Sequence, residues 1–417
     1  MLILYNFFIR CYQLAVYFAT FWNPKAKAWV TGRKNLFQKL TEKIKPSNEI
    51  IWIHCASAGE FEQGKPIIES LKQIHPHKKV LVSFFSPSGY AAGKKYNKAD
   101  IICFLPVDTR KNAERFLKTI NPQLAVFVKY EYWYHYLTAV QEQNIPLLLI
   151  SAIFRKDQVF FKRYGSFYRR VLQLYTKIFV QDEESKELLS SINIQSVISG
   201  DTRFDRVATI AKSFKSENSI EMQCIKIFAG NSKIIVAGST WPDDEKIIAQ
   251  VFSEMRGIKL IIVPHEINKE HIDSLQNAFS SSIRYSDLKE NSREADVLLI
   301  DNVGMLSRIY QFAAITYIGG GFNKSGIHNS LEAAVWGKPV IFGPNYKKFK
   351  EARDLVDKGG AFSIYNAQDL SDLIKTLLAD DIKLNDSGEA AKDYVLKNEG
   401  ATERIILYIQ ENRLLTN

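Results

Sequence analysis

A carboxylate at the end of a buried strand is the first residue that could do chemistry. Segment 50–66 reads IIWIHCASAGEFEQGKP, so an apolar run ends in Ser57, Gly59 and Glu60, and Pro66 predicts the opening of a helix. In sheets of parallel strands, ligands gather at the carboxyl ends of the strands. Glu60 could there accept the proton of a substrate hydroxyl, and Gly59 predicts a close backbone approach or a positive φ. The alternative is an acid that only complements a helix dipole.

A second acid follows another strand-like run in the same way. The run LAVFV at 124–128 is followed by KYEYW at 129–133, which puts Glu131 just past the strand. Two acids at the ends of neighbouring strands would share one cleft and could both take part in catalysis. The alternative for Glu131 is an ion-paired acid at a helix start.

The most informative stretch is rich in glycine and spans residues 319–344, GGGFNKSGIHNSLEAAVWGKPVIFGP. Glycines let a backbone approach a phosphate, a helix start attracts it, and a carboxylate in the first helical turn can accept both hydroxyls of a ribose. The sequence therefore predicts a nucleotide site. Its residues are Gly319, Gly320, Gly321, Lys324, His328, Asn329 and Glu332. The alternative is a glycine-rich turn capped by Asn329.

A weaker phosphate signal lies at 238–242, GSTWP, where Ser239 and Thr240 would present N–H groups and hydroxyls to an anion. Asp243 and Asp244 resemble a metal-binding pair, but acids are favoured at a helix start in any case. The four cysteines have neither zinc spacing nor a CxxC pair. We therefore predict no metal, no disulfide framework and a reducing compartment for the main body.

These residues must be positioned by two series of alternating strands and helices. Short apolar runs separated by stretches of helical period are typical of parallel sheets flanked by helices. The expected strands of the first series are 50–55, 79–85, 100–106, 124–128, 146–151 and 177–181. Those of the second are 233–240, 259–265, 296–301, 314–321 and 339–343. The polar, aperiodic segment 209–223 predicts the junction, and two such domains imply a cleft between them.

The charge of the chain is uneven. Residues 1–180 hold about 27 Lys and Arg against about 11 Asp and Glu, whereas the remainder has a small acidic excess, although the whole chain carries +10. A basic first half favours an anionic partner such as phospholipid headgroups, a phosphorylated lipid or nucleic acid. The alternative is a merely soluble basic surface. The basic aromatic run 154–177 could clamp a lipid phosphate or lie near the membrane surface, and the alternative is a solvated helix face that covers core aromatics.

The amino terminus, MLILYNFFIRCYQLAVYFATFW, is apolar over about 22 residues, and its only charged side chain is Arg10. An aromatic and basic border follows, and no small-residue cleavage site is present, so a membrane anchor is favoured over a removable signal. The positive charges would keep the body in the cytoplasm. Because Arg10 interrupts the run, a helix lying in the interface is the second possibility, and a packed helix of the first domain is the third.

Several motifs in chain order together resemble the 3-deoxy-D-manno-octulosonic acid (Kdo) transferases of lipopolysaccharide synthesis. Members of that family carry a Ser-x-Gly-Glu turn, a Pro-x-Asp segment and a Glu-x-Trp segment. The resemblance runs along nearly the whole chain, including the hydrophobic amino terminus. The matching positions here are Ser57 to Glu60, Pro106 to Asp108, Glu131 to Trp133, Gly200 to Asp205, Ser239 with Thr240, and the glycine-rich loop.

The resemblance implies an α/β, GT-B glycosyltransferase fold of two Rossmann-like domains with a cleft between them. We accordingly expect a membrane anchor at 1–30, an acceptor-binding domain at 31–210 and a nucleotide-sugar domain at 211–417. Family members are inverting enzymes that use no bound metal. The expected partners are CMP-Kdo, a phosphorylated lipid A precursor (lipid IVA) and the cytoplasmic face of the bacterial inner membrane, with no nucleic acid and no cofactor.

The resemblance also implies roles for individual residues. The general base of the family maps to Glu60, which would deprotonate the acceptor hydroxyl. Helix starts at Ser239 with Thr240 and at Asn329 would stabilise the leaving CMP, while Glu332 would hold its ribose.

Two departures from the family pattern affect these roles. Lys129 stands where most members have the first acid of Glu-x-Glu, and His265 stands where an arginine is expected near the CMP phosphate. His265, Arg203 and Lys324 are the candidate substitutes for that arginine. Two other readings stay open: a GT-B enzyme that uses a UDP-sugar and a lipid-linked acceptor, and a non-catalytic membrane-bound nucleotide-sugar-binding protein.

Overall fold

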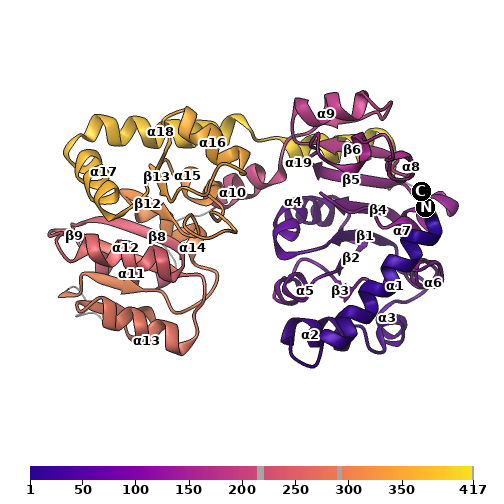
Figure 1. Ribbon diagram of the computed structural model, residues 1–417, viewed down its shortest axis with the longest axis horizontal. Coiled ribbons are helices and arrows are strands. Elements are labelled where there is room, and N and C mark those ends of the chain that lie inside the picture. The colour runs from indigo at the N-terminus through magenta and orange to yellow at the C-terminus, as the bar shows by residue number, and fades with distance from the viewer. Residues whose placement is uncertain (214–219, 289–293, 416–417) are drawn as a thin grey trace. The chain divides into compact units, whose positions relative to one another are not determined.

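The computed structural model describes residues 1–213, 220–288 and 294–415. It divides into two compact units, Met1–Arg206 with Glu399–Asn417, and Val207–Asn398 (Figure 1). The division after Arg206 differs little from the predicted boundary at 210. The predicted second domain, 211–417, is wrong at its far end, because the last helix packs its apolar side chains Ile405, Ile406 and Ile409 into the core of the first unit.

The first unit is built on a seven-stranded sheet in which every pair of neighbours is parallel, in the order β3-β2-β1-β4-β5-β6-β7. The strands are β1 (Ile50–Cys55), β2 (Lys79–Phe84), β3 (Ile101–Phe104), β4 (Pro122–Val128), β5 (Leu147–Ala152), β6 (Lys177–Val180) and β7 (Val197–Ile198). Strand order reverses between β1 and β4. This is the point at which open α/β sheets bind their ligands.

Helices cover both faces of this sheet, so its strands are apolar throughout. Ile51 and Ile53 of β1 face one core, which α4 and α19 close, while Trp52 faces the other, which α3, α6, α7 and α8 close. The helices of the unit are α1 (Leu2–Ala19), α2 (Pro24–Gly32), α3 (Leu36–Lys43), α4 (Ala58–Ile74), α5 (Pro87–Lys94), α6 (Arg110–Ile120), α7 (Tyr134–Glu142), η1 (Val159–Phe161), α8 (Ser166–Leu172), α9 (Glu183–Ser190) and α19 (Ala401–Glu411).

The second unit repeats the plan with a parallel sheet in the order β10-β11-β9-β8-β12-β13-β14. Its strands are β8 (Lys233–Thr240), β9 (Ile258–Pro264), β10 (Ser282–Arg284), β11 (Val297–Leu299), β12 (Ile315–Ile318), β13 (Val340–Phe342) and β14 (Ala361–Ser363). One face of the sheet packs against apolar side chains of α12, α13 and α17. Here too the order reverses beside the longest strand, between β8 and β12.

The remaining helices are α10 (Thr202–Ser213), α11 (Ile220–Ala229), α12 (Pro242–Phe252), α13 (Lys269–Ala278), η2 (Tyr285–Asp287), α14 (Leu306–Ile309), η4 (Tyr310–Phe312), α15 (Leu331–Ala334), α16 (Lys350–Asp357), α17 (Ala367–Ala379) and α18 (Asp381–Lys397). The predicted aperiodic junction 209–223 is wrong where it can be described, because α10 and α11 extend into it from both sides. Residues 214–219 of that segment lie outside the described residues.

One helix start was also mispredicted. Pro66 was expected to open a helix, but α4 begins at Ala58 and contains Pro66 as a buried interior residue. Ser57 is the N-cap of α4, and Glu60 stands three residues later in its first turn, which is the sequence signature of a capping box. The start of α4 is therefore set by Ser57 and Glu60.

Candidate functional site

Glu60 lies at the carboxyl edge of the first sheet, in the first turn of α4, the helix that follows β1. Its Oε2 accepts hydrogen bonds from the backbone N–H of Ser57, at 2.6 Å, and from the Ser57 hydroxyl. The side chain is half-buried. The carboxylate therefore stabilises the start of α4, as the alternative interpretation of Glu60 predicts. This cap uses only one of the two carboxylate oxygens, Oε2. Oε1 receives no hydrogen bond from the described part of the chain.

Neither feature predicted for Gly59, a close backbone approach or a positive φ, is found in the structure. It is a helical, exposed residue without a positive φ, and an added Cβ would meet only the Ser57 hydroxyl, at 3.8 Å. No close backbone approach therefore requires glycine at this position. A small residue next to Glu60 does leave open space beside the carboxylate.

Glu131 lies at the same edge, past β4, which is the direct neighbour of β1. Its side chain is 3% exposed, and Oε2 accepts hydrogen bonds from His54 Nε2, at 2.8 Å, and from Trp133 Nε1. His54 is itself fully buried on β1, and its Nδ1 lies 2.9 Å from the Ser83 hydroxyl of β2. Glu131 thus closes a buried polar chain across three adjacent strands, and His54, which the sequence reading had missed, is its principal partner.

Asp108, part of the Pro-x-Asp motif, fastens the amino-terminal helix to the first unit. Its carboxylate accepts hydrogen bonds from the Tyr5 hydroxyl and from the backbone N–H groups of His135 and Tyr136, at 3.2 and 3.1 Å. Burial raises the pKa of Asp108 to about 6, against the effect of these three bonds. A second bond, 2.6 Å long, joins His135 Nε2 to Asn6 Oδ1.

The helix that Asp108 holds is α1, the predicted membrane segment. It has the length and the apolar composition of a membrane span, and none of its residues is buried. Tyr5 contacts the rings of Tyr134 and Phe167, and Tyr12 contacts Trp29 and Phe85. The helix therefore lies along the body of the first unit over two turns or more (Figure 1).

In the second unit, three adjacent strands bring the predicted donor residues to one edge. Ser239 and Thr240 end β8, His265 follows β9, and the three glycines Gly319, Gly320 and Gly321 follow β12. Ser239 is half-buried and has a left-handed backbone, with φ 54°, which a residue other than glycine rarely adopts. Thr240 is fully buried, and its hydroxyl donates to Glu245 at 2.8 Å, so this hydroxyl is already engaged.

The glycines permit close packing of neighbouring loops. A Cβ on Gly321 would lie 2.4 Å from the backbone nitrogen of Gly343, and Gly320 has φ +89°. The N–H of Gly320 donates to Asp244 at 2.8 Å, so this group is not free for a phosphate. The predicted glycine-rich turn exists, but its geometry is explained first by backbone packing.

Asp244, which the sequence reading discounted, holds this loop in place. The side chain is 1% exposed and accepts hydrogen bonds from the N–H groups of Trp241 and Gly320 and from the Tyr317 hydroxyl, at 2.9, 2.8 and 2.7 Å. It thereby joins the start of α12, the strand β12 and the glycine turn. Asp243, one position earlier, is 62% exposed.

Three aromatic rings stack beside that turn. Trp241 stacks on His265 with ring centroids 4.6 Å apart, and His265 stacks on His328 at 4.5 Å. Trp241 Nε1 donates to His328 Nε2 at 2.9 Å, which fixes Nε2 as an acceptor and the ring as neutral. Burial, followed by the nearby His265, lowers the pKa of His328 to about 4, and burial also lowers the pKa of His265.

We expect this stack to make the second unit sensitive to acid. Because the pKa of His328 is lower in the folded chain than the ordinary value near 6.5, the unfolded chain binds more protons between those values. Stability should therefore fall as the pH drops from about 6.5 towards 4. Thermal unfolding at pH 7.5 and at pH 5 will measure the loss, and His328→Gln, which keeps an acceptor for Trp241, should show a smaller one. Equal losses in both proteins would disprove the assignment.

The other predicted donor residues are partly engaged with one another. Asn329 Nδ2 donates to Glu332 Oε1 at 3.1 Å, and Asn329 Oδ1 accepts from the N–H of Leu331, while Ser330 and not Asn329 is the N-cap of α15. Lys324 is exposed. Arg203 belongs to the first unit, where it pairs with the buried Asp201 at 2.7 Å. Among the described residues, no group of three or more His, Cys, Asp or Glu side chains is arranged to hold a metal ion.

Comparison with known proteins shows which family this chain is similar to. Residues 32–206 match the family model described as 3-Deoxy-D-manno-octulosonic-acid transferase (kdotransferase). The 3-deoxy-D-manno-octulosonic acid transferase of Aquifex aeolicus is 28% identical over 377 residues, 87% of this chain and 96% of its own. That of Rickettsia felis is 26% identical over 382 residues, 89% of this chain and 81% of its own. Residues 32–206 are therefore identified as a Kdo transferase domain, and the similarity to Kdo transferases extends over most of the chain.

A further relative of this chain is longer. The bifunctional glycosyltransferase/methyltransferase of Fusobacterium nucleatum is 27% identical over 428 residues, which cover 99% of this chain. This chain spans 62% of the length of that relative.

Solved structures support the fold of this chain. UDP-GlcNAc 2-epimerase from Neisseria meningitidis superposes with a TM-score of 0.62 at 17% identity, over 87% of this chain and 100% of that one. MurG from Acinetobacter baumannii gives 0.53 at 12%, over 87% and 99%. At such identities the likeness concerns the fold alone. The predicted α/β, GT-B class with two Rossmann-like sheets is confirmed.

Proposed function

We propose that the chain is an inverting glycosyltransferase that moves Kdo from CMP-Kdo to a hydroxyl of a phosphorylated lipid A precursor, lipid IVA. The observation that carries this proposal is the position of Glu60. It lies within the segment that matches the family model, at the carboxyl edge of the first sheet, with Oε1 unengaged by the described residues. A carboxylate so placed can act as a general base.

In the proposed reaction, the acceptor hydroxyl attacks the anomeric carbon of Kdo from the face opposite CMP. Glu60 takes the hydroxyl proton as the new C–O bond forms and the bond to CMP breaks, so the configuration at the anomeric carbon inverts. Ser57 holds the carboxylate through Oε2, which orients Oε1 for this transfer. Glu131 takes no proton in this scheme. Its bonds to His54 and Trp133 suit a positioning residue that keeps the neighbouring edge in place.

The donor is assigned to the second unit. Ser239, the turn Gly319–Gly321 and His328 lie together at the edge of that sheet, and His265 stacks on His328. We propose that Ser239 and the remaining N–H groups of the turn bind the CMP phosphate, with His265 and Lys324 as candidate substitutes for the family arginine. Glu332, held by Asn329, is the proposed ribose ligand. Arg203 is a weaker candidate because Asp201 already pairs with it.

The acceptor and the membrane are assigned to the first unit, which carries the basic excess of the chain. Because α1 contacts the body of that unit at both Tyr5 and Tyr12, we favour a helix that lies in the membrane interface over one that crosses the bilayer. The proposed location is the cytoplasmic face of the bacterial inner membrane.

The test is transfer from freshly generated CMP-Kdo to lipid IVA by the purified full-length chain, followed by mass spectrometry of the lipid. We expect the lipid to gain Kdo, and we expect CMP but not UDP to inhibit. A product that forms only with a UDP-sugar, or inhibition by UDP alone, would refute the donor assignment. No transfer from any donor, combined with binding of CMP-Kdo, would instead support a non-catalytic role.

A further inference from the structure

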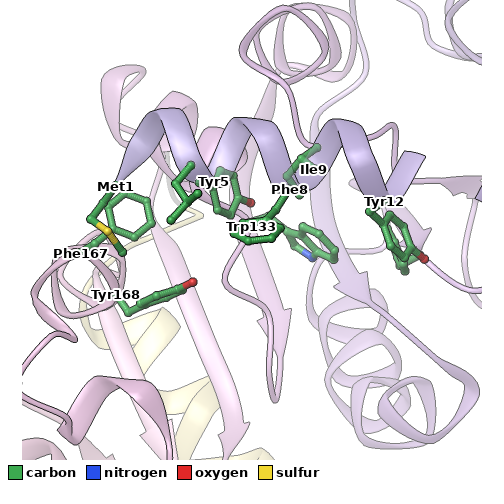
Figure 2. A pocket seen from close by; sticks show the side chains of 10 residues that line it. Met1, Tyr5, Phe8, Ile9, Tyr12, Trp133, Phe167 and Tyr168 are labelled. Carbon is green, nitrogen blue, oxygen red and sulfur yellow. The ribbon is translucent and has the colours of Figure 1, made fainter. Parts of the chain in front are cut away.

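An apolar pocket of about 430 Å³ lies between α1 and the body of the first unit (Figure 2). Its walls are side chains of α1 on one side and, on the other, aromatic residues from three separate loops and helices. The lining residues are Met1, Leu4, Tyr5, Phe8, Ile9, Tyr12, Phe85, Trp133, Phe167 and Tyr168. The volume is within the range of about 300 to 1,000 Å³ that is typical of small-molecule sites.

The polar atoms of two lining side chains are already engaged with the body of the protein. The Tyr5 hydroxyl donates to Asp108, and Trp133 Nε1 donates to Glu131. The rings of these residues therefore contribute apolar surface to the pocket. A site of this kind favours a hydrocarbon ligand over a sugar or a nucleotide.

One end of the pocket adjoins the turn that carries Glu60. Phe85, which directly follows β2, stacks on Trp133 with ring centroids 4.8 Å apart. The next residue, Ser86, donates its N–H to the carbonyl of Ala56 at 2.8 Å, immediately before Ser57. A ligand held against Phe85 and Trp133 would thus extend towards the Glu60 turn.

The other end adjoins the basic aromatic run 154–177, whose purpose the sequence alone did not decide. Phe167 and Tyr168 of that run line the pocket, and Arg163 and Arg170, close to them in the chain, are exposed. Exposed arginines next to an apolar pocket suit a ligand that joins a hydrocarbon chain to an anionic group. The outward surface of α1 is also apolar, since Phe7 and Phe18 are 59% and 58% exposed, which suits a lipid surface.

We infer that this pocket binds one acyl chain of the acceptor lipid. The inference rests on the proposed function and adds to it a site for the hydrophobic part of the acceptor. Bound there, the chain directs the phosphorylated sugar of the lipid towards Glu60, and Arg163 or Arg170 meets a phosphate. The pocket accordingly contributes to the affinity for the acceptor and not to the chemical step.

The first test fills the pocket without making α1 less apolar. Leu4→Trp adds bulk at a lining position, and Ile3→Trp is the matched control, one residue earlier on the same helix but outside the lining. If the added ring excludes two methylenes of the acyl chain, and each methylene contributes about fourfold to affinity, KM for tetraacylated lipid IVA should rise by roughly fifteenfold. We expect kcat to be unchanged. Ile3→Trp should have the KM of the wild type, and neither variant should change KM for CMP-Kdo.

Acceptors with shortened chains separate the pocket from general membrane binding. The wild type should prefer long chains, and Leu4→Trp should lose that preference. Equal KM values for Leu4→Trp and Ile3→Trp, or an unchanged chain-length preference in Leu4→Trp, would overturn the inference even if the wild type transfers Kdo normally.

A binding measurement keeps the inference testable if no transfer is observed. Lipid IVA brominated in its acyl chains should quench the fluorescence of Trp133, which is obtained as the difference between the wild type and Trp133→Phe. Unbrominated lipid IVA should relieve the quenching, and brominated phosphatidylglycerol should quench much less. Equal quenching by both lipids would mean that the pocket holds a bilayer lipid, and absence of Trp133 quenching would mean that it holds neither. Either result overturns the inference, while failure of transfer alone refutes only the proposed function.

Discussion

Glu60→Gln is expected to lower kcat for Kdo transfer by about a hundredfold or more, which is the usual range for loss of a general base. The substitution is well suited to the site, because a glutamine at the third position of a helix can replace glutamate in a capping box. The hydrogen bonds from Ser57 can therefore persist, and α4 should keep its start. What the variant loses is the ability to take the proton of the acceptor hydroxyl.

The same substitution two residues later supplies the control. Glu62 lies on α4 as well, is 42% exposed, and forms only a surface ion pair with Lys65. Glu62→Gln should leave kcat within about twofold of the wild type, because such pairs contribute little. Rates should be compared at saturating acceptor and donor, with CMP binding measured for each protein. If Glu60→Gln is as active as the wild type, the base is another group and the role given to the β1–α4 turn is wrong.

Asp244→Ala should cost the second unit roughly 3 kcal/mol and lower its unfolding midpoint by about 6 to 12 °C. The alanine leaves the N–H groups of Trp241 and Gly320 and the buried Tyr317 hydroxyl without their acceptor. The cost is smaller than the sum of three charged hydrogen bonds, because burial of the carboxylate, which raises the pKa of Asp244, already opposes them. Since Gly320 loses its fixed position, affinity for CMP should also fall by roughly tenfold.

Asp243→Ala removes the adjacent carboxylate from the same helix turn and is the matched control. Because Asp243 is 62% exposed, we expect at most about 0.5 kcal/mol of destabilisation and unchanged CMP binding. Calorimetry of the full chain and CMP titration will distinguish the two variants. If both aspartates behave alike, Asp244 is only a helix-start acid, as the sequence suggested. Should Asp244→Ala fail to fold, Asp244→Asn, which keeps one acceptor, is expected to give an intermediate loss.

Sequence reasoning succeeded where a local pattern determines the structure. The long strands β1, β4 and β8 contain apolar runs that are easily recognised, and Glu60, Glu131 and Ser239 lie at or just past their ends as expected. The strands missed by the prediction, β7, β10 and β14, are edge strands of two or three residues each, which have too few side chains to give a period.

The prediction failed where a role depends on a partner distant in the chain. Asp244 is a favourable helix-start acid in any local view, and only the fold brings Gly320 and Tyr317 to it. In the sequence, His54 is likewise only a polar residue in an apolar strand. Its partners Glu131 and Ser83 come from or follow neighbouring strands, so only the fold brings them to His54. Thr240 shows the converse. Its local pattern predicts a free hydroxyl, but in the structure this hydroxyl donates a hydrogen bond to Glu245.

The return of α19 to the first unit affects how the protein can be made. A ribosome delivers this chain from its amino end, so β1, β4 and α4 emerge long before Ile405, Ile406 and Ile409 exist to cover the apolar face they share. The second unit, by contrast, is continuous and can close its core as soon as α18 is complete. During translation, part of the interior of the first unit therefore stays uncovered until α19 has been made.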